Sequence, residues 1–176
     1  MYYVVQVKTG QEEKVIEEIK KYNNNQDVFI DVFSPFRVTL RKYHGQFKEV
    51  NERCFPGYIF IETDDVKEVF FNLYWVPEFT RLLGREGYTY NFLPLDKEEA
   101  RMIDILYNRN SGRKTEISNI EVTEGDRIRI LDGPLMGIES TIKKVDLHKR
   151  TIEVEFLLCS QLVTAKVGIN IVTKIN

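Results

Sequence analysis

The chain has 176 residues, 43% of them hydrophobic, which is enough for one medium domain or two small ones. Its net charge of -2 excludes a protein that is basic throughout, so nucleic-acid binding would need a local cluster of cations. Cys54 and Cys159 lack metal-site spacing, which favours a reduced, cytoplasmic protein, and no apolar run is long enough to cross a membrane.

The first elements are a strand, a helix and a hairpin. Tyr2 to Val7 is rich in aromatic and β-branched residues and predicts a strand. Thr9 and Glu12 have the spacing of a capping box, so we expect a helix to start there. Residues 28–40 read as extended, residues 43–46 as a hairpin tip and residues 47–53 as its return.

The stretch Phe55 to Ile61 begins with an aromatic residue and Pro-Gly, and then alternates as a strand. Alternation places Tyr58 and Phe60 on one side and Ile59 and Ile61 on the other. Tyr2, Val4 and Gln6 of the first strand would join the aromatic side, while Tyr3, Val5 and Val7 would face helices. The aromatic side is either core or an exposed apolar surface for a protein partner, and helices on only one side of the sheet favour the partner surface.

The rest of residues 1–107 continues this mixed pattern. A second helix follows Asp64 or Asp65, a strand covers Phe79 to Leu83, and Asp96 with Glu99 opens a third helix. The order predicts an α+β fold of the split-βαβ kind, an antiparallel sheet with helices on one face.

The composition changes after residue 107. Residues 108–119 are polar and without periodicity, which predicts a flexible linker. Residues 120–176 form only short alternating segments, which predict a small all-β barrel with strands at residues 127–131, 141–145, 151–156, 162–167 and 171–175.

We find no catalytic constellation in the sequence. His44 and His148 lie in predicted turns without a nucleophile nearby, and Cys54 is better read as a buried thiol than as a nucleophile. Nucleotide-binding and metalloprotease motifs are absent. The sequence therefore predicts a protein that is not an enzyme and that needs no cofactor or metal.

Two segments are locally basic. One is the hairpin between Arg37 and Arg53, and the other is the turn from Lys143 to Arg150. Each can be a solvated charged surface, which is the simpler reading for both, or a contact to a polyanion such as RNA.

Three features resemble the N-terminal domain of the NusG transcription factors: residues 2–6, residues 55–59, and Val76-Pro77 with Gly84. The resemblance implies docking to the clamp helices of RNA polymerase and reduced pausing, with DNA of the transcription bubble as a further contact. Carried over by position, the polymerase-binding residues are Gln6, Phe55, Pro56, Tyr58, Phe60, Val76 and Phe79.

Residues 124–146 resemble a KOW motif, the barrel that recruits a second partner in NusG-like proteins. The loop 157–161 lacks the aromatic residue typical of housekeeping members, and Ser140 replaces a usual glycine. These departures favour a specialised paralogue, and residues 164–169 are similar to the LoaP-type antiterminators, which read an RNA element.

The resemblance then implies a monomeric antitermination factor whose barrel binds leader RNA. The expected RNA-binding residues are Arg127, Arg129, Lys143, Lys144, His148, Lys149, Arg150 and Lys166. The alternative is a KOW-type RNA-binding or ribosome-associated protein without a polymerase role.

Overall fold

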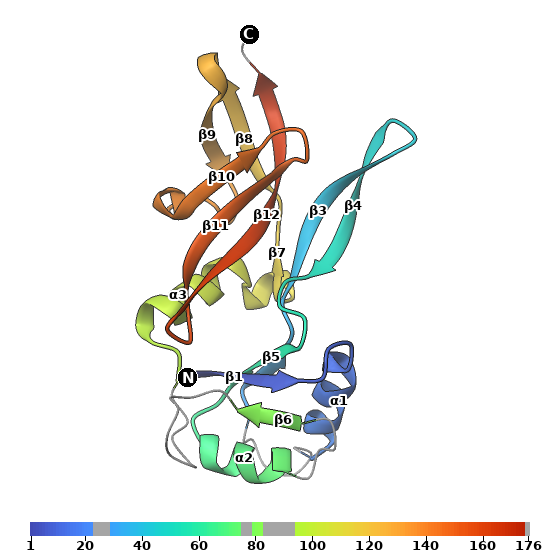
Figure 1. Cartoon of the computed structure of the whole chain (residues 1–176), viewed down its shortest axis with the longest axis vertical. Helices are drawn as coiled ribbons and strands as arrows, with labels where there is room; N and C mark the ends of the chain where they lie inside the picture. Colours follow the sequence, from blue (N-terminus) through green and yellow to red (C-terminus); the bar gives the residue numbers. More distant parts are fainter. Residues whose placement is uncertain (23–28, 75–78, 83–93, 175–176) are drawn as a thin grey trace. The chain divides into compact units, whose positions relative to one another are not determined.

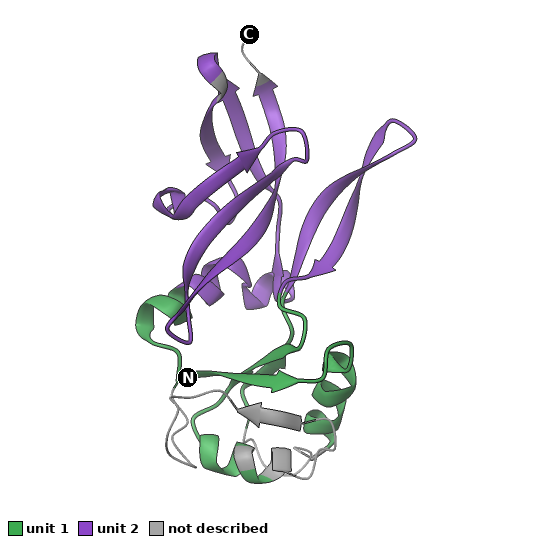
Figure 2. Ribbon diagram, in the orientation of Figure 1, with its two compact units in different colours: residues 1–35, 55–101 green, residues 36–54, 102–176 purple. Residues whose placement is uncertain are grey.

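The structure is a computed structural model that describes residues 1–22, 29–74, 79–82 and 94–174. Helices and three β-sheets form two compact units, one of residues 1–35 and 55–101 and the other of residues 36–54 and 102–176 (Figures 1 and 2). The predicted mixed α+β fold, with an antiparallel sheet near the N-terminus and an all-β region near the C-terminus, is confirmed.

A four-stranded sheet organises the first unit. Its strands lie in the order β2-β5-β1-β6, with β1 at Tyr2–Val7, β2 at Asp31–Phe33, β5 at Tyr58–Glu62 and β6 at Phe79–Leu82. Both β1 and β2 run antiparallel to β5, which lies between them. Helix α1 (Glu12–Tyr22) connects β1 to β2, so this part is a split βαβ unit as predicted.

One side of this sheet is the core of the first unit. Side chains of β1, β2 and β5 pack there with α1 and α2 (Val66–Tyr74), forming a buried cluster of Val5, Val7, Val15, Ile16, Ile19, Val32, Ile59, Ile61 and Val69. The strand alternation therefore divides the two sides as the sequence predicts.

Local capping explains where two helices begin. Helix α3 (Lys97–Leu106) starts with a reciprocal capping box, in which Glu99 N–H donates to Asp96 Oδ1 at 2.8 Å and Asp96 N–H donates to Glu99 Oε2 at 2.9 Å. At α2, Glu68 N–H donates to Asp65 Oδ1 at 3.1 Å. The capping box of α3 was predicted from its spacing, and for α2 the structure selects Asp65 from the two predicted caps, Asp64 and Asp65.

A five-stranded sheet forms the barrel region of the second unit. Its order is β10-β11-β12-β8-β9, with β8 at Ser118–Thr123, β9 at Arg127–Asp132, β10 at Ile142–Asp146, β11 at Thr151–Leu158 and β12 at Gln161–Lys174. The sequence analysis missed β8 and divided β12 in two. Strand β12 is continuous because its first part pairs with β11 and its last part pairs, in parallel, with β8.

The second unit also contains the predicted hairpin. Strands β3 (Phe36–Tyr43) and β4 (Gln46–Arg53) pair antiparallel, and β3 lies against β12. A Cβ at Gly168 of β12 would overlap the backbone oxygen of Val38, so the two strands approach closely only because this residue is glycine.

Residues 108–119, which we expected to be a flexible linker, contain regular structure. They hold the 3₁₀ turn η1 (Arg109–Ser111) and strand β7 (Lys114–Thr115), which pairs in parallel with β3. The buried Arg113 guanidinium donates to the carbonyl of Tyr107 at 3.1 Å. Polar side chains here bond to nearby backbone, which composition alone does not reveal.

Among the described residues, no helix is both long and apolar enough to span a membrane.

Candidate interaction surfaces

The second side of the N-terminal sheet carries the predicted aromatic residues, and we call it the aromatic face. Across β1 and β5, Gln6 pairs with Tyr58 and Val4 with Phe60, while Phe33 of β2 pairs with Phe60 from the other side. The fold thus gathers Gln6, Tyr58 and Phe60 on neighbouring strands, as the alternation predicts.

Most of the aromatic face is buried, which corrects the prediction that it would be exposed. Phe60 has no exposed surface, and Tyr2, Val4 and Phe33 are also buried. The ring of Phe60 stacks on Phe33 with centroids 5.5 Å apart, and Phe55 packs on it at 5.8 Å. Phe60 therefore lies beneath the surface and supports its neighbours, because the rings of Phe33 and Phe55 pack against it.

The accessible part of this face is its edge near the turn before β5. Pro56 is exposed, whereas Gln6, Phe55 and Tyr58 are half-buried. These four of the seven predicted polymerase-binding residues can contact another molecule. Val76 lies outside the described residues, and Phe79 begins β6 with its backbone paired to Val7.

The turn that presents Pro56 is fixed by a buried carboxylate. Glu12 has 1% of its surface exposed, and its Oε1 accepts a hydrogen bond from Gly57 N–H at 2.6 Å. Gly57 has a φ of 84°, and a Cβ there would lie 2.9 Å from Thr9 Oγ1, so glycine is required. Val7 N–H donates to the Gly57 carbonyl at 2.9 Å and joins the turn to β1.

The sequence analysis missed this role of Glu12, which it assigned to helix capping alone. No local sequence pattern predicts a contact between residues that are 45 positions apart. A buried charge-assisted hydrogen bond of this kind contributes about 1.5–3 kcal/mol. Glu12 therefore sets the geometry of the accessible edge.

Half of the predicted RNA-binding residues are neutralised by carboxylates. The ion pairs are Arg129 with Glu121 at 2.7 Å, Lys143 with Glu155 at 3.2 Å, Lys166 with Glu153 at 3.5 Å and Lys149 with Asp146 at 4.0 Å. Three of these four carboxylates lie on an adjacent strand, which a linear count of cations cannot show, whereas Asp146 lies three residues before Lys149 in the same turn. Within the described part of the chain, Arg127, Lys144 and His148 are exposed and make no ion pair.

The turn between β10 and β11 concentrates the remaining cations. The pKa of Asp146 lies below its usual range, chiefly because its carboxylate accepts a hydrogen bond from Lys149 N–H at 2.8 Å. The positive charges of Lys149, Lys144 and His148 lower that pKa further, so one carboxylate lies among several cations. This part of the predicted cluster stays net positive.

Arg150 is held rather than free. Its guanidinium lies over the ring of Phe47 in the hairpin, 4.1 Å from the centroid, and its Nη1 donates to Asn170 Oδ1 at 3.3 Å. Phe47 was not among the predicted site residues, and the signal for it, an aromatic residue beside the hairpin tip, was too weak to find it. A cation over an aromatic ring is stabilised by the ring's quadrupole.

The remaining candidate groups are unsuited to catalysis. Burial raises the pKa of the Cys54 thiol to about 11, so it is protonated at neutral pH and is a poor nucleophile. In the part of the chain that the structure describes, no group of three or more His, Cys, Asp or Glu could hold a metal ion.

Comparison with known proteins decides the family. The model of the family described as "Transcription termination factor nusG" matches residues 1–104. The chain belongs to the NusG family.

NusG proteins of several bacteria align with most of the chain. The Lactococcus lactis transcription termination/antitermination protein NusG is 30% identical and covers 88% of this chain and 83% of its own. The Haemophilus influenzae protein of the same name is 24% identical over 99% of this chain and 94% of its own.

Among solved structures, one titled "Domain interaction in Thermotoga maritima NusG" has the same fold. It matches with a TM-score of 0.55 and 21% identity, covering 95% of this chain and 92% of its own. NusG-family proteins are non-enzymatic regulators of transcription that act with RNA polymerase. The predicted family and the predicted absence of enzymatic activity are therefore confirmed.

Proposed function

We propose that this protein is a transcription elongation factor that binds the clamp helices of RNA polymerase and promotes processive antitermination. The contact is made by the accessible edge of the aromatic face, namely Gln6, Phe55, Pro56 and Tyr58, with Phe60 supporting it from beneath. Val76 and Phe79 remain proposed members of the same site.

The observation that carries this proposal is the turn at residues 55–58. A half-buried Phe55 and Tyr58 flank the exposed Pro56, and the buried Glu12 holds the turn in place. A rigid apolar edge suits a groove between helices, because little conformational entropy is lost on binding. The protein would act without chemistry of its own, by binding the closed clamp more tightly than the open clamp.

The barrel would recruit a second partner, leader RNA. Arg127 and Lys144 are exposed cations of the barrel that make no ion pair with a described residue, and His148 is an exposed imidazole in the same turn as Lys149. Arg129, Lys143, Lys149 and Lys166 would exchange a carboxylate for a phosphate. This assignment fits a specialised paralogue of the LoaP type that acts as a cytoplasmic monomer. Residues 1–107 would then be the polymerase-binding domain and residues 120–176 the KOW domain, joined by residues 108–119.

Retention on core RNA polymerase tests the aromatic edge. The Tyr58→Ala variant should lose most of its retention, because the half-buried ring at the centre of the contact is removed. Phe71→Ala is a matched control, since Phe71 is an exposed aromatic side chain of α2. Equal retention of Tyr58→Ala and wild type would refute the assignment.

A single-round transcription assay past a terminator tests the antitermination role. The protein should raise read-through on a template with its upstream leader and have a smaller effect without the leader. RNA binding in isolation without retention on polymerase would instead favour the alternative, a KOW-type RNA-binding or ribosome-associated protein.

A further inference from the structure

Positive charge is concentrated in two segments of this chain. The hairpin (residues 36–54) and the β10–β11 segment (residues 142–150) together hold nine Lys and Arg and three Asp and Glu. The whole chain has 25 and 27, so the remaining residues hold 16 cations and 24 carboxylates. The rest of the chain taken together is therefore acidic, whereas these two segments are basic.

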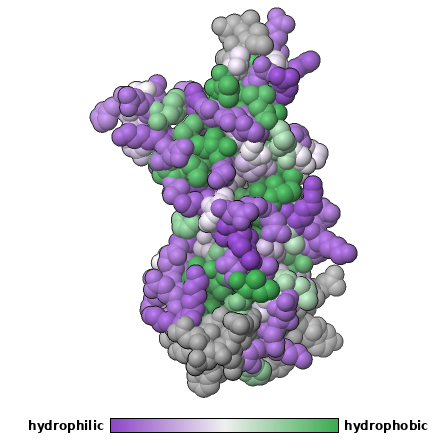
Figure 3. All heavy atoms as spheres, turned by 180° about the vertical axis from the view of Figure 1, so that it is seen from behind, coloured by the Kyte–Doolittle hydropathy of each residue, from purple (hydrophilic) through white to green (hydrophobic). Residues whose placement is uncertain are grey.

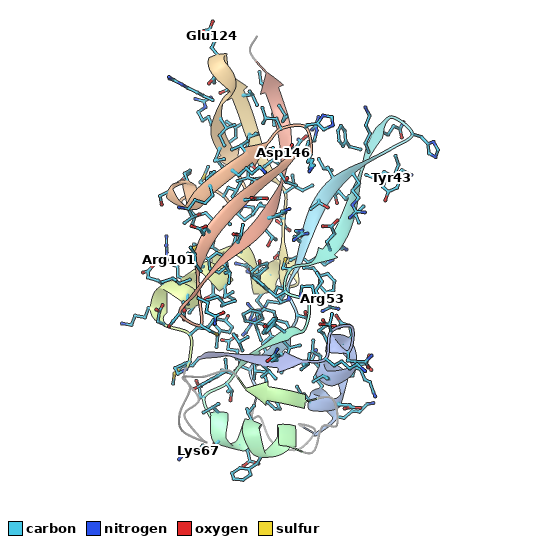
Figure 4. The ribbon with its side chains drawn as sticks, viewed as in Figure 1. Tyr43, Arg53, Lys67, Arg101, Glu124 and Asp146 are labelled. Carbon is cyan, nitrogen blue, oxygen red and sulfur yellow. The ribbon has the colours of Figure 1, made fainter. Side chains whose placement is uncertain are left out.

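The second unit brings the two segments together. Arg150, at the end of the β10–β11 turn, has its guanidinium over the ring of Phe47, next to the hairpin tip. Asp146 in the turn and Tyr43 in the hairpin mark the two elements in Figure 4. The close approach of β3 to Gly168, whose backbone pairs with Thr151, holds the base of the hairpin against the same part of the barrel.

The stacked pair is itself held in position. Asn170 accepts from Arg150 at 3.3 Å and donates to Asn119 Oδ1 at 3.0 Å, and Asn119 donates to Asp132 at 3.0 Å. This chain of hydrogen bonds orients the guanidinium. The Arg150 guanidinium thus links the hairpin to the turn, with the Phe47 ring on its face and Asn170 as its acceptor.

The hairpin tip carries an excess of positive charge. Arg41 and Lys48 lie directly opposite each other across β3 and β4, an arrangement of like charges that destabilises a hairpin. Glu52 pairs with Arg37 at 2.7 Å and also with Arg41, so one carboxylate serves two cations. Lys42 lies opposite Phe47, the residue that Arg150 contacts, and makes no ion pair with any described residue.

We infer that the hairpin and the barrel turn form one composite surface for a single-stranded nucleic acid, comprising Lys42, Phe47, Lys144, His148, Lys149 and Arg150. Phosphates would meet the lysines and would relieve the repulsion between the two segments. Phe47 is 41% exposed, and its ring and the Arg150 guanidinium offer flat faces on which unpaired bases stack.

This inference rests on the proposed role of the barrel and extends its site to the hairpin. RNA and single-stranded DNA share the chemistry that these residues recognise, since both present phosphates and unpaired bases. The two sources are separated by experiment, with oligouridine and oligodeoxythymidine of equal length as probes.

Fluorescence anisotropy of both labelled probes with the full chain tests the composite surface. Lys42→Ala should weaken binding and flatten its salt dependence by about 0.7 in the log–log slope, and Lys144→Ala with Lys149→Ala should weaken binding and flatten the slope by about 1.4. Phe47→Leu should weaken binding about tenfold, because it keeps an apolar side chain but loses the stacking face. Lys20→Ala with Lys21→Ala removes the same charge as the barrel variant, from exposed positions of α1, and should bind as wild type does.

The outcomes separate this inference from the proposed function. Loss of binding in the barrel variant alone would overturn the composite surface and leave the barrel as the nucleic-acid site. Wild-type binding by both the hairpin and the barrel variants would overturn the composite surface and the proposed nucleic-acid role of the barrel, and it would leave the proposed polymerase contact to its own test. Inorganic polyphosphate competing as well as the oligonucleotides, with no effect of Phe47→Leu, would overturn the single-strand assignment.

Discussion

The aromatic face and the basic surface differ in how much of each remains available to a partner. On the aromatic face, alternation correctly places the side chains, but neighbouring rings bury Phe60 and leave only the edge near Pro56 accessible. On the barrel, the predicted cations are nearly all exposed, but carboxylates neutralise half of them. An apolar surface is thus limited by burial and a charged surface by pairing.

The molecular surface contains both hydrophobic and hydrophilic areas. On the face shown in Figure 3, hydrophobic side chains reach the surface in groups separated by hydrophilic ones. Folded domains normally expose many apolar atoms, so these hydrophobic groups do not identify a partner by themselves.

The largest expected effect on stability distinguishes Phe60, which supports the aromatic face from beneath, from Tyr58, which would contact the polymerase. Phe60→Ala should lower the free energy of unfolding by about 3–5 kcal/mol, because a fully buried ring is lost. Tyr58→Ala, on the same strand, should cost about 1 kcal/mol while abolishing polymerase retention. Urea unfolding measures the free energy of unfolding of both variants. Equal destabilisation by the two changes would contradict the different roles of Phe60 and Tyr58.

The next effect concerns the buried carboxylate. Glu12→Gln should lower the free energy of unfolding by about 1–2 kcal/mol, because the hydrogen bond to Gly57 loses its charge but keeps a neutral acceptor. Its neighbour Glu13 is exposed, so Glu13→Gln is the matched control and should change stability by about 0.5 kcal/mol or less. Weaker polymerase retention of Glu12→Gln alone would connect the turn to binding, and identical curves for both variants would contradict this role.

A similar effect is expected where the hairpin approaches the barrel. Gly168→Ala should lower the free energy of unfolding by about 1–3 kcal/mol, because a methyl group would overlap the backbone of β3. Thr164→Ala changes an exposed side chain on the same strand and serves as control. If Gly168→Ala unfolds at the same urea concentration as wild type, the close approach is not a stabilising contact.

The smallest effect on stability is expected for a variant that tests whether ion pairs weaken nucleic-acid binding by the basic surface. Glu153→Gln should change the free energy of unfolding by about 0.2–1 kcal/mol, because an exposed ion pair is worth little. It frees Lys166, so binding to oligouridine should tighten and its salt slope should steepen by about 0.7. The control Glu17→Gln removes one negative charge from α1. If it tightens oligouridine binding to the same extent, the change in net charge, and not the release of Lys166, explains the gain.

Sequence reasoning succeeded where the determining contacts are local. The capping box of Asp96 and Glu99 spans three residues, and the two sides of β5 follow from alternation within one strand. Both depend on chain geometry that neighbouring residues share.

It failed where the decisive partner is distant. Glu12 meets Gly57 and Arg150 meets Phe47 across long stretches of chain, and each contact forms only after the strands between them have paired. Exposure of Phe60 was misjudged for the same reason, because alternation tells which side a residue faces and not what covers it. The polar segment 108–119 was misread because its side chains satisfy nearby backbone.

The parallel pairing of β12 with β8 has a consequence for how the chain is made. Strand β12 is the last described strand in the chain, yet it lies between β11 and β8 at the centre of its sheet and carries Gly168 against the hairpin. During synthesis from the N-terminus, β8 and β9 can pair early, but β11 and β8 have no common neighbour until residues 161–174 have emerged. The hairpin cannot pack against β12 until residue 168 has emerged, so the basic surface is assembled later than strands β1, β2 and β5 of the aromatic face.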